Sequence, residues 1–272
     1  MCLILASAAA PASSQTPLRL TLDGRIEAPT APLLFALEQG YFKNEGLEVA
    51  IEPSAGGVEP ITRVVSGGYE LGIADINTLI RYRDQNPNAP IRAIFIVNNR
   101  PSYAVIGRKS RGVETLADVQ GKRLGLAPAE PATFAWPILA RVNQIDPAKV
   151  VGVNVGLLVR EPMLAAGEVD AVTGASYSTP LNLREKGVPA EDISVFLMAP
   201  HGVELYGTAI FANARALAEK PEAIKGFLSG FTQGLKDTIK DPGAAIMPIV
   251  RRNGGVTREI EQERLSILIR DS

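Results

Sequence analysis

The side chains of this chain that could recognise a ligand or carry protons are mostly carboxylates, tyrosines and hydroxyls that follow strand-like segments. In the first half these candidates are Asp23, Arg25, Thr30, Asp75, Asn77, Ser102 and Tyr103. In the second half they are Glu130, Thr133, Trp136, Ser176, Tyr177, His201, Glu204 and Tyr206. The charged candidates lean acidic, which favours a ligand with N–H donors or positive charge over a bare anion. Helix capping or ion pairing by the same carboxylates is the alternative.

Four aromatic side chains among these candidates could stack on a flat ligand: Tyr103, Trp136, Tyr177 and Tyr206. Trp136 lies one turn into a predicted helix, so it fits a hydrophobic core equally well. Tyr177 follows a strand, where a large ring is more typical of a site. His201 is the only histidine, and a lone imidazole is more typical of a structural hydrogen bond than of a switch.

The sequence predicts no catalytic constellation. His201 has no nucleophile elbow to pair with, Cys2 is the only thiol, and no glycine-rich loop has a phosphate-binding spacing. With no Cys/His cluster, no metal or other cofactor is predicted. Glu130 and Asp75 are the only acid–base candidates for a lyase-type enzyme. We therefore expect a binding protein rather than an enzyme.

The elements that must position these candidates occur twice, because the two halves of the chain echo each other about a hundred residues apart. The matching strand-like segments are 18–23 with 123–127, 47–51 with 151–155, 69–75 with 168–174, 91–97 with 193–199, and 103–108 with 206–212. Helical segments alternate with these strands, which is typical of parallel β-α-β units. The pattern predicts two α/β lobes with mainly parallel sheets and a ligand cleft between the carboxyl ends of their strands.

The last part of the chain is predicted to be helical, at 215–217, 221–239, 243–252 and 258–269, without a strand of its own. Such helices must cover an existing sheet. We assign them to the first lobe, which then comprises 16–105 plus 207–272, and the second lobe comprises 106–206. Two strands near 103–108 and 206–211 would be the crossover connections.

Composition excludes several kinds of partner. The 272 residues include 28 basic and 29 acidic side chains and are 46% apolar, as expected of a globular monomer with no attraction to nucleic acid or anionic membranes. No segment reaches the length of a transmembrane helix of ~20 apolar residues. Residues 1–15 resemble the end of a secretory signal without its basic start, which favours an exported, periplasmic protein; a frayed apolar tail is the alternative.

Four motifs, in order along the chain, carry a family resemblance. They are PLLFALEQGYFKNEGLEV (residues 32–49), GGYELGIA (67–74), LADVQGKRLG (116–125) and AGEVDA (166–171). The chain resembles solute-binding proteins of ABC importers, in the group that binds nitrate, alkanesulfonates, taurine and thiamine pyrimidines. Members of this group usually extend beyond the position of Ser272, so part of the C-terminal helical cover is expected to be absent.

The resemblance implies a type II periplasmic-binding-protein fold that closes on a small molecule by hinge motion and delivers it to a membrane permease. The expected ligand is an aromatic or nitrogen-containing heterocycle such as a pyrimidine. The alternatives are a small anion (alkanesulfonate, taurine or nitrate) and a cytoplasmic lyase-type activity on the same fold. Pyrimidine binders usually have a tryptophan soon after the first strand's aspartate, whereas Gly24 and Arg25 follow Asp23 here. Fungal pyrimidine synthases of similar sequence use a cysteine-rich iron site, which this chain lacks, so their activity is not expected.

Overall fold

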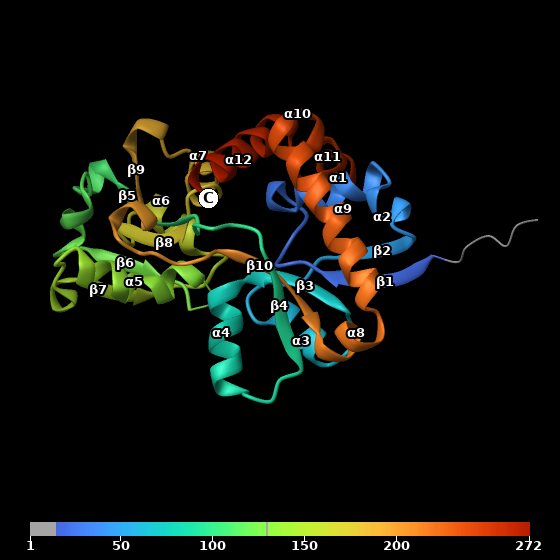
Figure 1. Ribbon diagram of the computed structural model, residues 1–272. Coiled ribbons are helices and arrows are strands. Elements are labelled where there is room, and N and C mark those ends of the chain that lie inside the picture. Colours follow the sequence, from blue (N-terminus) through green and yellow to red (C-terminus); the bar gives the residue numbers. More distant parts are fainter. Residues whose placement is uncertain (1–14, 129) are drawn as a thin grey trace, which may run out of the picture.

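The computed structural model describes residues 15–128 and 130–272, which form two lobes (Figure 1). Each lobe is built on a sheet of five strands, in the order β2-β1-β3-β10-β4 in lobe 1 and β7-β6-β8-β5-β9 in lobe 2. Cys2 lies outside the described residues, as does the predicted signal remnant, residues 1–15, except for Gln15. No described helix has both the length and the apolar character needed to cross a membrane.

Lobe 1 combines parallel and antiparallel pairing. Its strands are β1 (Thr16–Thr21), β2 (Leu47–Glu52), β3 (Leu71–Asp75), β4 (Ile91–Ile96) and β10 (Thr208–Asn213). Its first helices are η1 (Ala28–Thr30), α1 (Ala31–Glu38), α2 (Tyr41–Asn44), α3 (Glu59–Val65) and α4 (Ile76–Gln85). Strand β1 pairs in parallel with β2 and β3, whereas β10 runs antiparallel between β3 and β4. The sheet is mixed rather than mainly parallel.

Lobe 2 repeats this order. Its strands are β5 (Tyr103–Arg108), β6 (Arg123–Leu126), β7 (Val151–Asn154), β8 (Ala171–Ala175) and β9 (Ile193–Leu197). Its α-helices are α5 (Pro131–Val142), α6 (Arg160–Ala166) and α7 (Thr179–Glu185). Its short 3₁₀ turns are η2 (Lys109–Arg111), η3 (Leu116–Val119), η4 (Pro147–Lys149), η5 (Ala190–Asp192) and η6 (Ala199–His201). The echo in the sequence therefore corresponds to two sheets of the same topology.

The chain passes between the lobes twice, and each passage ends in an antiparallel strand. After β4 the segment 97–102 leads from lobe 1 into β5, the second strand from one edge of the lobe 2 sheet. After β9 the segment 198–207 returns to β10, which has the corresponding position in lobe 1. Strands near 103–108 and 206–211 were expected to be the connections themselves. Instead they pair inside the sheets, and the short segments before them connect the lobes.

The C-terminal helices mostly cover lobe 1. They are α8 (Ala214–Glu219), α9 (Pro221–Lys240), α10 (Pro242–Ala245), α11 (Met247–Arg252) and α12 (Arg258–Asp271). Helix α9 packs on α1 and α2, and the rings of Phe42 and Phe227 stack with their centroids 5.0 Å apart. Gly234 allows the close approach, since a Cβ there would collide with Pro32. Helix α12 begins beside η1 and reaches α7 of lobe 2 (Figure 1).

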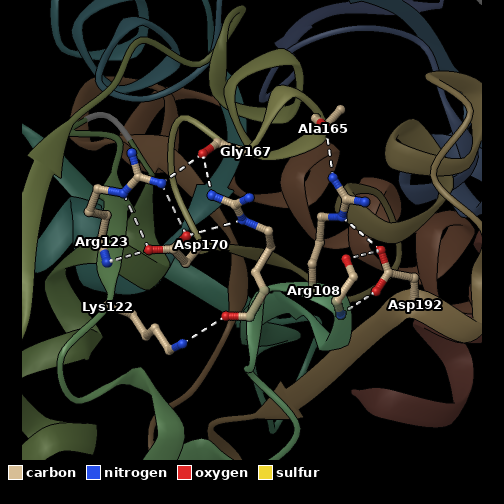
Figure 2. A network of polar contacts seen from close by, with 9 residues as sticks. Arg108, Lys122, Arg123, Ala165, Gly167, Asp170 and Asp192 are labelled. Carbon is tan, nitrogen blue, oxygen red and sulfur yellow. Dashed lines mark hydrogen bonds and ion pairs between the residues drawn. The ribbon is translucent and has the colours of Figure 1, made fainter.

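Each lobe has a staple in which an arginine of one strand binds a carboxylate that directly precedes another strand. In lobe 2, Asp170 accepts hydrogen bonds from the backbone N–H of Arg123 (2.9 Å) and from its guanidinium, which also donates to the Gly167 carbonyl (2.7 Å). Figure 2 shows this network together with the separate Arg108–Asp192 pair. In lobe 1, Glu70 accepts from Arg19 N–H (2.9 Å), and the Arg19 side chain donates to Gly68 O (2.9 Å). All of the staple residues except Arg19 belong to the four sequence motifs, and they join neighbouring strands.

Candidate functional site

The loops that follow β1, β3, β6 and β8 meet between the two lobes. The carboxylates of Asp75 in lobe 1 and Glu130 in lobe 2 lie close enough to Asp23 for their negative charges to raise its pKa. Burial raises the pKa of Asp23 to about 7, the amide of Gly57 opposes this change, and the charges of Asp75 and Glu130 add to it. The sheets therefore bring acidic groups from both lobes to one place.

Asp23 is surrounded by protein yet open to water. Its side chain is solvent-exposed, and its Oδ1 accepts one hydrogen bond from Gly57 N (3.1 Å). Water around the carboxylate favours the charged form and so limits the rise in its pKa. A ligand that displaced this water would raise the pKa further unless it donated hydrogen bonds to the carboxylate. Asp23 is consequently well suited to accept N–H groups.

Asp75 lies at the first turn of α4 and ties the connecting segments to lobe 1. Its Oδ1 accepts from the amides of Asn77 (2.9 Å) and Thr78 (3.0 Å), which caps the helix. Its Oδ2 accepts from the hydroxyl of Tyr103, which follows the first connecting segment. The Asn77 amide group donates to Tyr103 Oη (3.2 Å) and to the Tyr206 carbonyl (2.8 Å) in the second segment. Burial raises the pKa of both Asp75 and Tyr103.

Glu130 enters the site from the first turn of α5 and is held by Arg160. The guanidinium Nη1 of Arg160 lies 2.7 Å from Glu130 Oε2, and its Nη2 lies 2.6 Å from Glu161 Oε1. Arg160 and Glu161 are both 5% exposed. Burial lowers the pKa of Arg160, but the two neighbouring carboxylates outweigh it and raise the value above its ordinary level. This buried pair supports Glu130 from within lobe 2.

Tyr177 is half-buried after β8 and faces the same charges. Burial raises the pKa of its phenol, and the negative charges of Glu130, Asp23 and Glu27 raise it further, whereas Arg264 opposes them. The phenol therefore stays neutral and can donate a hydrogen bond at ordinary pH. Its ring offers a flat surface beside the carboxylates.

The side chains of several predicted site residues already form hydrogen bonds with other groups of the protein. Thr133 and Thr173 share a hydrogen bond (2.7 Å), Thr30 donates to the Glu27 carbonyl (2.7 Å), and His201 Nδ1 lies 2.6 Å from the Leu197 carbonyl. Ser102 and Ser176 are engaged by the end of α12, at Ser272 (2.6 Å) and Asp271 (2.6 Å) respectively. These contacts occupy the polar atoms that the sequence nominated.

The remaining candidates are either buried in a core or exposed at the surface. Trp136 is 6% exposed and packs in the core of lobe 2, the role that its helical position left open. Arg25 and Glu204 are exposed, as is the side chain of Tyr206, whose carbonyl takes part instead.

Three charged helical residues around the site were not predicted from the sequence. Arg160, Glu161 and Arg264 belong to helices, away from the loops in which candidates were sought. Arg264 is 5% exposed, donates to Glu261 (3.0 Å) and lies 3.8 Å from Glu27. The sequence feature that could have indicated two of them is the charged pair Arg160 and Glu161, which follows a strand and a short apolar loop.

Two open hollows lie elsewhere on the surface. One, about 710 Å³, is lined by residues of α2 and α9 and by Phe95, and another, about 320 Å³, is lined by Val65, Tyr82 and 86–89. Neither contains the charged groups described above. Within 15–128 and 130–272, no cluster of three His, Cys, Asp or Glu side chains could hold a metal ion.

Solved structures identify the class of fold. The periplasmic aliphatic sulphonate binding protein SsuA from Escherichia coli superposes with a TM-score of 0.77 at 12% identity. The match covers 93% of this chain and 84% of that one. The two lobes, each with one antiparallel strand that follows a connecting segment, thus form a periplasmic-binding-protein fold, as predicted.

The chain belongs to the NMT1/THI5-like family, whose match extends over residues 28–245. A formylaminopyrimidine-binding protein of Halalkalibacterium halodurans is 26% identical over 247 residues, which cover 87% of this chain and 72% of the relative. A 4-amino-5-hydroxymethyl-2-methylpyrimidine phosphate synthase of Schizosaccharomyces pombe is 25% identical over 220 residues. That match covers 78% of this chain and 62% of the synthase, less than two thirds of its length.

The relatives correct one prediction from the sequence. We expected no enzymatic function, but curated relatives of this chain from three fungi are named as synthases. The expectation was wrong because it relied on absent catalytic motifs and missing cysteines to separate binding proteins from enzymes. The family contains both.

Proposed function

We propose that this chain binds a small nitrogen-containing heterocycle of the pyrimidine class between its two lobes. The supporting observation is that carboxylates of both lobes, Asp23, Asp75 and Glu130, converge there beside the neutral phenol of Tyr177. Ring and exocyclic N–H groups can donate to these carboxylates while the ring packs against the tyrosine. A bare sulfonate or nitrate would be repelled by the same groups.

The name of one relative gives independent support. The protein from Halalkalibacterium halodurans is a formylaminopyrimidine-binding protein, and the match covers most of both chains. By analogy with periplasmic binding proteins, we further propose that the chain acts outside the cytoplasm and delivers its ligand to the permease of an ABC importer. Residues 16–105 with 207–272 would then move against 106–206 as the lobes close.

Calorimetric titration tests the proposal directly. The protein is titrated with 4-amino-5-hydroxymethyl-2-methylpyrimidine, with formylaminopyrimidine and, as controls, with ethanesulfonate and nitrate. Saturable binding of a pyrimidine with a micromolar Kd, about 8 kcal/mol, is expected. Binding of ethanesulfonate or nitrate without binding of either pyrimidine would contradict the proposal and favour the anion binder.

The synthase relatives favour a second candidate function, formation of the pyrimidine phosphate that their name specifies. The chain spans 62% of that relative's length. Incubation of the purified protein with a desalted metabolite extract, followed by mass spectrometry for the pyrimidine phosphate, would test it. Product that appears with the protein and is absent without it would support synthesis.

A further inference from the structure

We propose that Glu161 sets the charge of the inter-lobe site and thereby its selectivity. By sharing Arg160 with Glu130 it leaves one net negative charge on the three groups, so that ligands with N–H donors are preferred over anions. This inference rests on the proposed binding function and identifies a specificity-determining residue for it. Glu161 itself acts through Arg160 and is a positioning residue.

Arg160, Glu130 and Glu161 form a charged triad inside lobe 2. Arg160 contacts Glu130 at 2.7 Å and Glu161 at 2.6 Å, and the side chains of Arg160 and Glu161 are each 6% exposed. One guanidinium shared by two carboxylates leaves one net negative charge. If Glu161 were neutral, Arg160 would cancel the charge of Glu130. Because buried charges are poorly screened, that difference would be felt throughout the site.

The triad is fixed by further contacts. Arg160 also donates to the Thr179 hydroxyl (3.1 Å) and to the Thr173 carbonyl (3.3 Å). Gly174 leaves the space for this arrangement, since a Cβ there would lie 3.3 Å from Arg160 Nη1 and would collide with Thr179. The contacts of lobe 2 therefore fix the position of one guanidinium beside Glu130.

The charge of Glu130 reaches groups contributed by both lobes. It raises the pKa of Asp23 in lobe 1 and of Tyr177 in lobe 2, and also that of Tyr103 beside the first connecting segment. A change in the net charge of the triad should therefore alter the site as a whole.

The corresponding helix of lobe 1 shows what lobe 2 has added. Helix α3 begins Glu59-Pro60 and α6 contains Glu161-Pro162, 102 positions later. Val58 precedes the first pair and Arg160 precedes the second. Glu59 pairs with Arg63 at the surface, where its side chain is 36% exposed, whereas Glu161 is turned inward onto Arg160. Lobe 2 thus has a buried ion pair where lobe 1 has a partly exposed one.

The test compares the full chain with Glu161→Gln, which keeps an acceptor for Arg160, and with Glu185→Gln as a control. Glu185 is an exposed carboxylate of the same lobe. Calorimetry uses 4-amino-5-hydroxymethyl-2-methylpyrimidine and ethanesulfonate as probes. In Glu161→Gln we expect pyrimidine affinity to fall about tenfold and ethanesulfonate affinity to rise, with no change in the control.

A second measurement needs no ligand. Carboxyl NMR titration should show a lower pKa for Asp23 in Glu161→Gln than in the unaltered protein, because the site becomes less negative. The groups around Asp23 that contribute are Asp75, Glu130 and the amide of Gly57. An unchanged pKa of Asp23 together with unchanged selectivity would overturn the inference. An equal loss of affinity for the pyrimidine and for ethanesulfonate would also overturn it. If the unaltered protein binds no pyrimidine, the proposed function fails, and this titration still tests the inference.

Discussion

The two lobes are alike at the amino ends of their strands and different at the carboxyl ends. Both sheets have the same strand order. In both, an arginine of one strand (β1 or β6) is bound to an acid and a glycine carbonyl shortly before another (β3 or β8): Arg19 with Glu70, and Arg123 with Asp170. Where the lobes face each other, lobe 1 presents Asp23 and Asp75, whereas lobe 2 presents Glu130 held by the buried Arg160.

The difference separates the parts of the molecule that maintain the fold from those that select a ligand. The repeated staples are remote from the meeting loops and connect strands, so their loss should cost stability and leave ligand selectivity intact. The unlike carboxyl ends have acidic groups in unequal surroundings, so changes there should affect binding more than stability.

The largest effect is expected at the staple of lobe 2. Asp170→Asn should lower the free energy of unfolding by about 2 kcal/mol, because Asp170 is 8% exposed and accepts from both Arg111 and Arg123. The matched change Glu70→Gln should cost about 1 kcal/mol, since its partners Arg19 and Lys220 are more accessible to solvent. Urea unfolding measures both. A larger loss for Glu70→Gln would contradict this ranking.

The Asp170 difference should also depend on pH. Burial favours the neutral acid, but hydrogen bonds from Arg123 outweigh it and lower the pKa of Asp170. The stabilisation is therefore complete above the unfolded-state pKa of about 3.9 and is lost as the pH falls through the lower folded-state value. Unfolding curves of the unaltered protein and Asp170→Asn should converge in acid. A constant difference down to the acid transition would disagree with this assignment.

An intermediate effect of opposite sign is expected at Asp23. Because its folded-state pKa is raised to about 7, protonated Asp23 favours folding below about pH 4, and this contribution is lost as the pH rises through 7. Asp23→Asn should therefore stabilise the protein at pH 8 by about 1 kcal/mol, a value reduced by solvent screening, and weaken pyrimidine binding about tenfold. Asp84→Asn, at an exposed position of α4, is the control. Lower stability of Asp23→Asn than of the unaltered protein at pH 8 would contradict the raised pKa of Asp23.

The smallest effect is expected where the lobes touch directly. The guanidinium of Arg81 on α4 lies 3.4 Å from the ring centroid of Phe134 on α5, so the contact joins lobe 1 to lobe 2. Exposed cation–π pairs contribute about 0.5–1 kcal/mol. Arg81→Gln should therefore speed ligand release about threefold in stopped-flow measurements, with stability nearly unchanged. Equal release rates for Arg81→Gln and the exposed control Arg252→Gln would show that the contact does not hold the lobes together.

Much of the fold was predictable because strands repeat at a fixed offset. Strands β2, β5 and β9 begin where the hydrophobic pattern placed them, and helix α9 begins at the predicted residue 221. The antiparallel placement of β5 and β10 was not predictable, because alternation along one strand does not say which neighbour it pairs with. The expected crossover strands therefore proved to be members of the sheets.

The candidate site was predictable only in part. Asp23, Asp75 and Glu130 follow strands whose carboxyl ends meet, so a topological rule was sufficient to bring them together. Arg160 comes from a helix and reaches Glu130 only because Gly174 leaves room, and that is a property of packing. Ser102 and Ser176 were nominated by their loops, but the end of α12, 170 and 95 residues further on, engages their hydroxyls.

The most direct test of the central claim is a crystal structure of the protein with formylaminopyrimidine. We predict the ring between the lobes beside Tyr177, with at least one N–H group within hydrogen-bonding distance of Asp23, Asp75 or Glu130. A ligand bound instead in the hollow between α2 and α9, or a sulfonate held between the lobes where no pyrimidine binds, would contradict it.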